Sequence, residues 1–419
     1  MSTTRREFLS LSLGGAAVAA LGPVIPAFRA RTAAAALRAD GGDTALIVVQ
    51  LAGGNDGLNT VVPYADDEYA KNRTTLRLTG DQVHKIDDQL GFHPKMAALK
   101  RLYDEGLLTV VQGVAYPNQS DSHPRSMEIW QTAMPDETNC QTGWLGRALD
   151  KHCDPTAAHD PAVFVGRIAR PLALNAERVF VPSVRSLEEC TLKVVGGSGA
   201  GQPEQQLPAG KAETARPGNG NPLLDFVQDG IRSAHTASGK VAEVAGRSTS
   251  GRTYPPFQLA QSLRIVAQLI RAELGIRVFF TELGGGSPGG FDNHANQLGN
   301  HDALLRELSE SVAALADDLK HDRLLDRVVL MTFSEFGRTL VENGRRGTGH
   351  GEAAPMFLVG GALRGGLVGP HPNLTDLRKG SPKFHTDFRR VYATMLDGWL
   401  GLDSQAVLGR RFEPLDVLA

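Results

Sequence analysis

Carboxylates, imidazoles and serines, the side chains that bind metal ions or act as nucleophiles, gather in five short segments of this sequence. The segments are residues 53–59 (GGNDGLN), 120–126 (SDSHPRS), 284–294 (GGGSPGGFDNH), 334–338 (SEFGR) and 347–352 (GTGHGE). Each follows or borders a predicted strand, and loops at the carboxyl ends of parallel strands meet in one crevice. Any one segment is a weak signal, but five at one edge of a sheet predict a ligand or metal site.

Five residues in these segments are candidate metal ligands: Asp56, Asp292, His294, Glu335 and His350. Asp292 and His294, two residues apart after a run of glycines, can point into one cavity as ligands. A buried carboxylate is rarely left unpaired, so Glu335, at the end of an apolar strand, needs a metal ion or an arginine. The alternatives are structural, because Asp56 suits an Asx turn and Asp292 can cap a helix beside a solvated His294.

Two candidate catalytic residues, Ser122 and Arg125, lie at the predicted start of a helix. Serine often caps a helix there, yet the same position lowers the cost of negative charge on a nucleophile or a bound anion. Pro124 favours the first helical turn and so puts the Ser122 hydroxyl ahead of the free amides, whereas Ser126 is expected to bond to the local backbone. We therefore expect Ser122 to be the nucleophile. Arg125 is either a clamp for the remaining ester oxygens or a surface charge.

The elements that position these residues alternate between strands and helices. Short apolar runs predict strands, and apolar residues at helical spacing predict helices. The predicted strands are residues 45–51, 107–114, 162–166, 277–281, 327–333 and 355–360. The predicted helices are residues 94–105, 125–133, 144–152, 259–274, 293–320 and 387–400. Strands separated by helices predict an α/β fold, a three-layer αβα sandwich around a mostly parallel, doubly wound sheet.

The composition is that of a globular protein. The chain of 419 residues has 41% hydrophobic and 21% charged residues, which excludes global disorder. Its 44 Lys and Arg against 46 Asp and Glu give a net charge of −2, so no nucleic-acid partner is expected. We expect one domain over residues 43–419. A stretch rich in Gly, Pro, Ala and Gln predicts a mobile surface insertion at about residues 191–222.

The first 40 residues have the layout of an export signal. Arg5 and Arg6 precede an apolar run, residues 9–20, which is followed by prolines and an alanine-rich stretch. The arginine pair indicates the Tat type, with the Tat translocase as a partner during export and a periplasmic or extracellular mature protein. The alternative is a short membrane anchor. Glycines and Pro23 leave the run short of the roughly 20 apolar residues that span a bilayer, so no stable membrane span is expected.

The three cysteines of the chain, Cys140, Cys153 and Cys190, add little to this interpretation. No two of them have the CxxC spacing of a zinc or redox site. A disulfide between Cys140 and Cys153 and a set of free thiols are both open.

With these motifs in view, the sequence resembles the alkaline phosphatase-like superfamily and, within it, the exported bacterial family known as domain of unknown function 1501. The resemblance covers nearly the whole chain after the predicted signal and implies an alkaline phosphatase-like form of the three-layer fold. It rests on residues 51–64 (LAGGNDGLNTVVPY), 122–130 (SHPRSMEIW), 289–297 (GGFDNHANQ), 334–338 (SEFGR) and 386–396 (TDFRRVYATML).

The resemblance also implies chemistry. In that superfamily a nucleophile at a helix start and a set of Asp and His side chains surround one or two metal ions. By motif, these roles fall on Ser122, Asp56, Asp292, His294, Glu335 and His350. Where the superfamily has an Asp-His pair, this chain has Glu335-Phe336, so one ligand of a second ion is missing. A single divalent ion, Zn, Ca or Mg, is the expected cofactor.

The function implied by the resemblance is an exported metal-dependent hydrolase of a phosphate or sulfate ester, acting on a small molecule or a glycan. The alternative is a non-catalytic secreted binding protein that keeps the alkaline phosphatase-like fold. The Glu335-Phe336 departure favours the binding protein, whereas the set of serine, carboxylates and histidines favours the enzyme.

Overall fold

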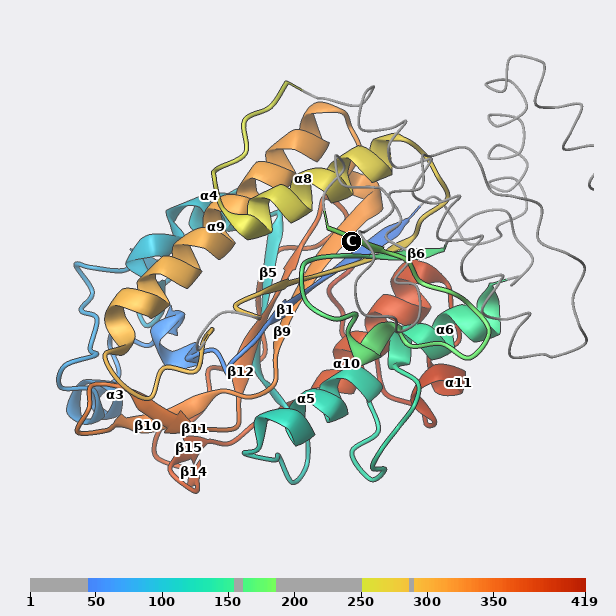
Figure 1. The fold of residues 1–419 in the computed structure, drawn as a ribbon. Helices are drawn as coiled ribbons and strands as arrows, with labels where there is room; N and C mark the ends of the chain where they lie inside the picture. The colour runs from blue at the N-terminus through green and yellow to red at the C-terminus, as the bar shows by residue number, and fades with distance from the viewer. Residues whose placement is uncertain (1–43, 154–160, 186–250, 286–289) are drawn as a thin grey trace, which may run out of the picture.

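The computed structural model describes residues 44–153, 161–185, 251–285 and 290–419 (Figure 1). The predicted export signal at residues 1–40 and the predicted insertion at residues 191–222 lie outside the described residues, so both stay predictions. The extent of the single domain, residues 43–419, also stays a prediction. No helix in the described part of the chain is both long enough and apolar enough to cross a membrane.

A nine-stranded sheet forms the centre of the described structure, in the order β13-β5-β12-β9-β1-β8-β6-β7 with β16 beside β5. β1 pairs in parallel with β8 on one side and with β9 on the other. Every residue of β1, β5, β8, β9 and β12 is buried, as expected for a sheet covered on both faces. The strands are β1 Ala45–Leu51, β5 Leu108–Ala115, β6 Ala162–Val165, β7 Ser183–Val184, β8 Val278–Leu283, β9 Val328–Ser334, β12 Ala354–Val359, β13 Gly366–Val368 and β16 Thr386–Asp387.

Helices cover both faces of the sheet, and Figure 1 shows the two helical layers on either side of it. One layer holds α4 (Ala97–Asp104), α8 (Gln258–Arg271) and α9 (Gln297–His321), which share one hydrophobic core with the sheet. The other layer holds α5 (His123–Thr132), α6 (Trp144–His152), α10 (Phe388–Ala393) and α11 (Ser404–Leu408), which enclose a second core. The predicted three-layer αβα sandwich with a mostly parallel sheet is therefore confirmed.

The remaining elements are short and lie around the sheet. Helix α3 is Asp67–Asn72, and seven short strands of the described residues form one three-stranded and two two-stranded sheets. These strands are β2 Val61–Val62, β3 His84–Lys85, β4 Gly91–Phe92, β10 Arg338–Glu342, β11 Thr348–His350, β14 Leu377–Arg378 and β15 Ser381–Pro382. Four 3-10 turns and one π-helical turn complete the set: Gly57–Asn59, Pro94–Met96, Leu172–Leu174, Leu325–Arg327 and Thr394–Leu400.

Two details of the fold bear on the site. Strand β12 is antiparallel to β5 and β9, so the chain enters it at the edge where the parallel strands end. The segment before β12, which contains His350, therefore reaches the carboxyl edge of the sheet.

The helix predicted over residues 293–320 begins at Gln297 instead, after Asn296 in a left-handed conformation. The residues directly before it, which include Asp292 and His294, therefore belong to a loop rather than to the helix.

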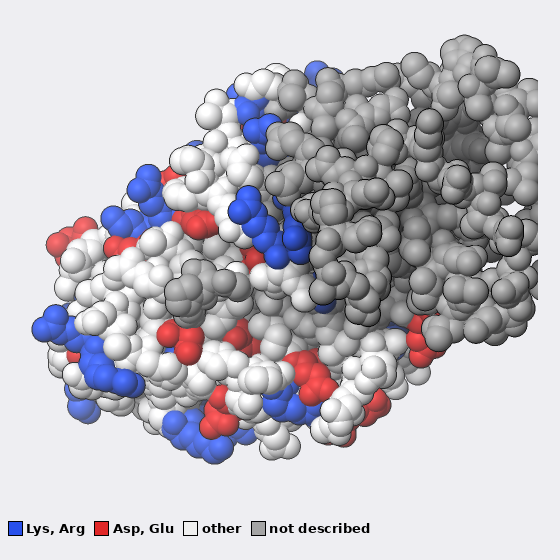
Figure 2. Space-filling model, in the orientation of Figure 1, with Lys and Arg blue, Asp and Glu red and all other residues white. Residues whose placement is uncertain are grey.

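The surface and the cysteines show nothing exceptional. Basic and acidic side chains are interspersed over the described part of the face in Figure 2. Cys140 and Cys153 are both free and partly exposed, so the disulfide left open by the sequence is not formed. Cys190 lies outside the described residues.

Candidate metal centre

One oxygen of Asp292 is the meeting point of three imidazoles and a guanidinium. Asp292 lies in the loop between β8 and α9, and its Oδ1 lies 2.9 Å from Nε2 of His294, 3.3 Å from Nε2 of His350 and 3.4 Å from Nε2 of His123. Nη2 of Arg338 donates to the same oxygen at 2.7 Å. Partial burial alone would raise the pKa of Asp292, but the hydrogen bond and charge of Arg338 hold it below its usual value.

The partner of His123 determines which ring nitrogen carries the proton. Nδ1 lies 2.9 Å from Oε1 of Glu335, and an ionised carboxylate only accepts, so Nδ1 is the donor. Nε2 of the neutral ring then keeps a lone pair. This nitrogen is buried and has no hydrogen-bond partner among the described residues, although it faces Asp292. The hydrogen bond with Glu335 raises the pKa of His123, and partial burial offsets part of that effect.

His350 is held in the same way from a different element. It is the last residue of β11, and its Nδ1 lies 2.6 Å from the carbonyl oxygen of Asp121. Because a carbonyl oxygen only accepts, Nδ1 again carries the proton and Nε2 keeps its lone pair. Nε2 of His350 lies 2.9 Å from Nε2 of His294, which can donate its proton to His350 or to Asp292. His294 also has a hydrogen bond to the backbone of Thr348, which competes for its proton.

Buried contacts fix the loops that carry these side chains. Gly53 has a φ of +113°, and a Cβ there would lie 2.5 Å from the amide nitrogen of Asp292, so glycine is required. Arg338 is fully buried, and its guanidinium donates to the carbonyl oxygens of Gly53, Gly54 and Phe291 as well as to Asp292. Arg338 thus ties the turn after β1 to the loop after β8.

The ring of Phe336 packs against two of the imidazoles. Its centroid lies 4.5 Å from that of His350 in a stacked arrangement and 4.8 Å from that of His123. Phe336 is fully buried and so shields one side of each ring from solvent.

Three of the predicted metal ligands, Asp292, His294 and His350, lie together in the structure. Glu335 does not contact these three side chains directly. Its Oε1 accepts from Nδ1 of His123, whose ring lies between Glu335 and Asp292, and from the backbone N–H of Gly53. The partners of its carboxylate are thus an imidazole, a backbone amide and the hydroxyl of Ser334, and the arginine that the sequence left open is not among them.

Asp56 is not brought into this group. Both of its carboxylate oxygens accept from Arg73, at 2.6 Å and 3.0 Å, and one also accepts from Gln297. The pair is buried, with Arg73 0% exposed. A carboxylate occupied in this way has no free oxygen directed at an ion.

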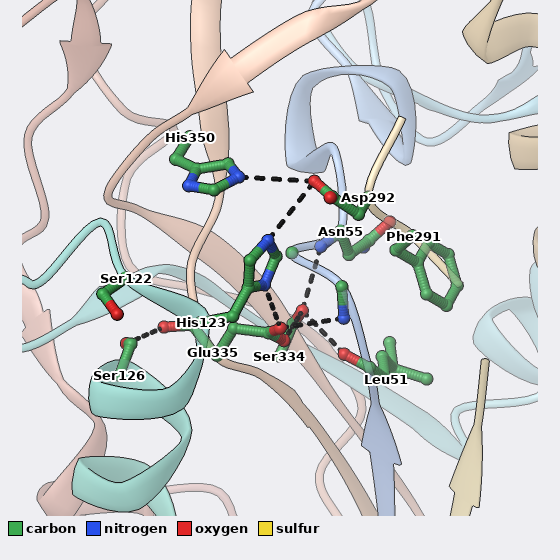
Figure 3. A network of polar contacts seen from close by, with 12 residues as sticks. Leu51, Asn55, Ser122, His123, Ser126, Phe291, Asp292, Ser334, Glu335 and His350 are labelled. Carbon is green, nitrogen blue, oxygen red and sulfur yellow. Dashed lines mark hydrogen bonds and ion pairs between the residues drawn. The ribbon is translucent and has the colours of Figure 1, made fainter. Parts of the chain in front are cut away.

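The two serines at the start of α5 have different surroundings. Ser122 is exposed at the N-cap position, and its side chain makes no capping hydrogen bond. Ser126 is buried, donates to the carbonyl oxygen of Glu335 and bonds to Tyr116 and Gln119. Figure 3 shows Ser122 to one side of the Asp292 group, with no contact drawn between them.

Arg125 does not face the group either. Its guanidinium donates to Glu128 at 2.7 Å and to the carbonyl oxygen of Pro135 at 2.7 Å. These contacts agree with the surface charge that the sequence left open for this residue, rather than with a clamp on the ester oxygens.

Sequence reasoning missed His123, Arg338 and Arg73 as members of these networks. The first two stand inside the segments 120–126 and 334–338, so the signal for them was present. An imidazole between a candidate nucleophile and a helix-starting proline deserves the same weight as the serine. Arg73 offered no such signal, because it follows the short helix α3 outside every motif.

The donor atoms of His123, Asp292 and His350 suit a metal ion. One atom from each lies within 4.8 Å of the others, and the described residues hold this one group of three. Two imidazole nitrogens and a carboxylate oxygen are the ligands that zinc and similar divalent ions prefer. The buried, unpartnered Nε2 of His123 is the atom that such an ion would satisfy.

A model of one protein family matches the second half of the chain. The family is described as a protein of unknown function (DUF1501), and the match spans residues 227–412. It includes Asp292, Glu335 and His350 but not Ser122 or His123. No curated protein matches the chain.

Several solved structures resemble the fold at low sequence identity. The periplasmic domain of EcEptC from Escherichia coli, in complex with Zn, has a TM-score of 0.36 and 11% identity and covers 76% of this chain and 73% of its own. The PsFucS1 sulfatase from Pseudoalteromonas sp. has a TM-score of 0.35 and 11% identity over 94% and 76% of the two chains. An alkaline phosphatase superfamily protein from Vibrio parahaemolyticus has a TM-score of 0.38 and 10% identity over 88% and 70%. The fold assignment rests on the strand order described above.

Proposed function

We propose that this protein is a metal-dependent hydrolase of phosphate or sulfate esters, with one divalent ion bound by His123, Asp292 and His350. The observation on which the proposal depends is the convergence of lone pairs on one point. Nδ1 of His123 donates to Glu335, and Nδ1 of His350 donates to the carbonyl oxygen of Asp121. Both Nε2 atoms therefore keep a lone pair, and both face Asp292. Acceptors that face one another in a partly buried site favour a cation between them.

A proton is the competing occupant of this point. A protonated His123 would donate from Nε2 to Oδ1 of Asp292, but these atoms lie 3.4 Å apart. An N–H···O hydrogen bond normally measures about 2.7–3.2 Å, and a charged one lies at the short end of that range. The longer separation is poor for that hydrogen bond, and His123 and Asp292 would instead hold a metal ion together.

The donor set favours zinc among the divalent ions, because two of the three ligands are imidazoles. An ion held by only three protein ligands would also be able to bind a substrate oxygen. An ion bound there supplies Lewis-acid chemistry, polarising the ester and stabilising the negative charge that develops on its oxygen.

The other candidate ligands argue for one ion rather than two. Arg73 occupies both oxygens of Asp56, and the residue that follows Glu335, a histidine in the pattern that the sequence resembles, is the buried Phe336. Arg338 adds a permanent positive charge beside Asp292. These buried groups leave no second set of ligands around Asp292.

Ser122 is the proposed nucleophile. It is exposed, it directly precedes the ligand His123, and it stands at the N-terminus of α5, where the helix dipole lowers the cost of negative charge on its oxygen. Attack by the Ser122 oxygen on phosphorus or sulfur would form a covalent seryl ester and break the bond to the substrate's alcohol, which would leave with the serine proton. Water would then hydrolyse the seryl ester and regenerate Ser122. Ser126 cannot take this role without leaving its buried hydrogen bonds.

Export by the Tat pathway belongs to the same proposal and rests on Arg5 and Arg6 ahead of an apolar run. The double variant Arg5→Lys, Arg6→Lys should stay in the cytoplasm in cell fractionation. Export of this variant at the normal rate would contradict the Tat assignment.

The test of the enzyme is a metal assay followed by a panel of phosphate and sulfate esters. The exported protein should contain about one ion per chain and should turn over at least one ester. Ser122→Ala should keep the ion and the fold and lose turnover, whereas the matched variant Ser126→Ala should keep turnover and lose about 1 kcal/mol or more of stability.

Each outcome of that test has a distinct meaning. Full activity in Ser122→Ala would leave water as the nucleophile and end the covalent step. A bound ion with no turnover on any ester would favour the non-catalytic binding protein instead.

A further inference from the structure

We propose that Glu335 is a positioning residue rather than a metal ligand, and that it acts on the ion through the ring of His123. By accepting a hydrogen bond from Nδ1–H, Glu335 holds His123 in the tautomer whose Nε2 lone pair faces Asp292. This inference rests on the ion site of the proposed function. It assigns Glu335 a role different from the one that its motif implied.

The contacts of Glu335 place its carboxylate on the far side of the imidazole. Oε1 lies 2.9 Å from Nδ1 of His123, whereas Nε2, on the opposite side of the ring, faces Asp292. Figure 3 shows this order, with Asp292, the ring of His123 and Glu335 in succession. A carboxylate bonded to Nδ1 cannot also reach an ion held by Nε2 of the same ring.

Glu335 is itself held rigidly, as an orienting group must be. It directly follows β9, its side chain is 3% exposed, and its Oε1 also accepts from the backbone N–H of Gly53 at 2.9 Å. Its carbonyl oxygen accepts from Gln119 at 2.9 Å and from Ser126. Both ends of the residue are therefore fixed before any ion binds.

His350 has an equivalent support, but from the backbone. Its Nδ1 donates to the carbonyl oxygen of Asp121, which no substitution can remove. Glu335 is thus the support of the pair that can be tested by mutation. Metal-binding histidines generally have such a partner, and losing it typically lowers metal affinity roughly 10–100-fold.

The direct test is the tautomer of His123 in the metal-free, full-length protein, measured by nitrogen NMR of labelled histidine. The signal is assigned by its absence in His123→Gln. We expect the wild type to carry the proton on Nδ1. In Glu335→Gln the amide oxygen, which must still accept from Gly53, is an uncharged and weaker acceptor for Nδ1. The population with the proton on Nε2 should therefore rise, and zinc affinity measured by chelator competition should fall roughly 10–100-fold.

The matched control is Glu282→Gln. Glu282 lies near the end of the neighbouring strand β8, is 4% exposed and accepts a backbone N–H, that of Gly285, at 2.6 Å. It has no imidazole partner among the described contacts. Both variants remove one buried carboxylate, but only Glu335→Gln should change the tautomer and the zinc affinity. Glu335→Asp, which keeps an acceptor-only group, should retain the wild-type tautomer if the glutamine variant does not fold.

Several results would overturn the proposal. A wild-type His123 with its proton on Nε2 would contradict it, as would unchanged zinc affinity in Glu335→Gln. If Glu335 were a ligand, the zinc affinity of Glu335→Gln would fall while the tautomer of His123 stayed as in the wild type. Absence of zinc binding by the wild type would instead refute the proposed function, and the tautomer would still decide whether Glu335 orients His123.

Discussion

Asp292 and Asp56 occupy comparable places in the fold and have opposite environments. Each follows glycines in a loop after one of two paired parallel strands, β8 for Asp292 and β1 for Asp56. Asp56 is 2% exposed and gives both oxygens to Arg73. The side chain of Asp292 is 31% exposed and has one guanidinium donor and three imidazoles around a single oxygen.

The difference teaches how to separate a structural carboxylate from a functional one. A buried carboxylate that is fully paired stabilises the turn around it and has nothing left to offer a ligand. Arg73 also donates to the carbonyl oxygens of Leu340 and Thr339, so the Asp56 pair joins the turn after β1 to β10. The group around Asp292, in contrast, contains a buried imidazole nitrogen, Nε2 of His123, that has no hydrogen-bond partner among the described residues and that a cation could satisfy.

The largest expected effect comes from Asp292→Asn. Losing a charged ligand should lower zinc occupancy to a small fraction and reduce ester turnover roughly 1000-fold, because the ion contributes several kcal/mol to the transition state. Stability of the metal-free protein in urea should change by about 1 kcal/mol or less, since the asparagine oxygen can still accept from Arg338. Metal analysis, a rate assay and urea unfolding check the three parts. Normal zinc occupancy in this variant would remove Asp292 from the ligand set.

The same substitution at Asp56 should have the reverse profile. Asp56→Asn leaves the fully buried charge of Arg73 without its partner, and breaking a buried pair costs about 3–5 kcal/mol. Zinc occupancy should stay at about one ion per chain. The control Arg73→Lys should lose part of the same stability, because lysine cannot bond to both oxygens as arginine does. Loss of the ion in Asp56→Asn at unchanged stability would make Asp56 a ligand, as its motif suggested.

Much of the fold could be predicted from sequence because it depends on local patterns. The β-branched run at residues 45–51 is strand β1 with identical bounds, and the predicted strand 327–333 differs from β9 by one residue. The direction of β12 could not be predicted in this way. A buried strand has the same apolar composition in either orientation, so only its neighbours decide that it is antiparallel.

In the candidate site, too, local sequence patterns predict some of the residues, and contacts between distant residues determine the others. Asp292 and His294 are two residues apart, and their spacing alone predicts that they share a cavity. The role of Glu335 depends on His123, which is 212 residues away in the chain, and no local pattern reports that contact. Arg73 is 17 residues from Asp56 and follows a short helix, so the pairing that removes Asp56 from the site was equally hidden. Residue types therefore predicted the chemistry, while long-range contacts decide which residues perform it.

The smallest expected effect is a pH dependence that belongs to Asp56. Burial alone would raise the pKa of this carboxyl, but the charge and hydrogen bonds of Arg73 lower it to about 2, against 3.8 for an unperturbed group. A carboxyl whose pKa is lower in the folded state contributes its full stability at pH values above the unfolded pKa. That contribution is lost as the pH falls from the unfolded value through about 2, and it amounts to about 2 kcal/mol.

Comparing the wild type with Asp56→Asn isolates this contribution, because every other carboxyl titrates in both proteins. The stability advantage of the wild type in urea unfolding should shrink by about 2 kcal/mol between about pH 5 and about pH 2. The measurement uses metal-free protein, so that release of an ion by acid does not enter the difference. An advantage that stays constant over this range would mean that Asp56 is not held ionised by Arg73. The contrast with Asp292 would then lose its electrostatic basis.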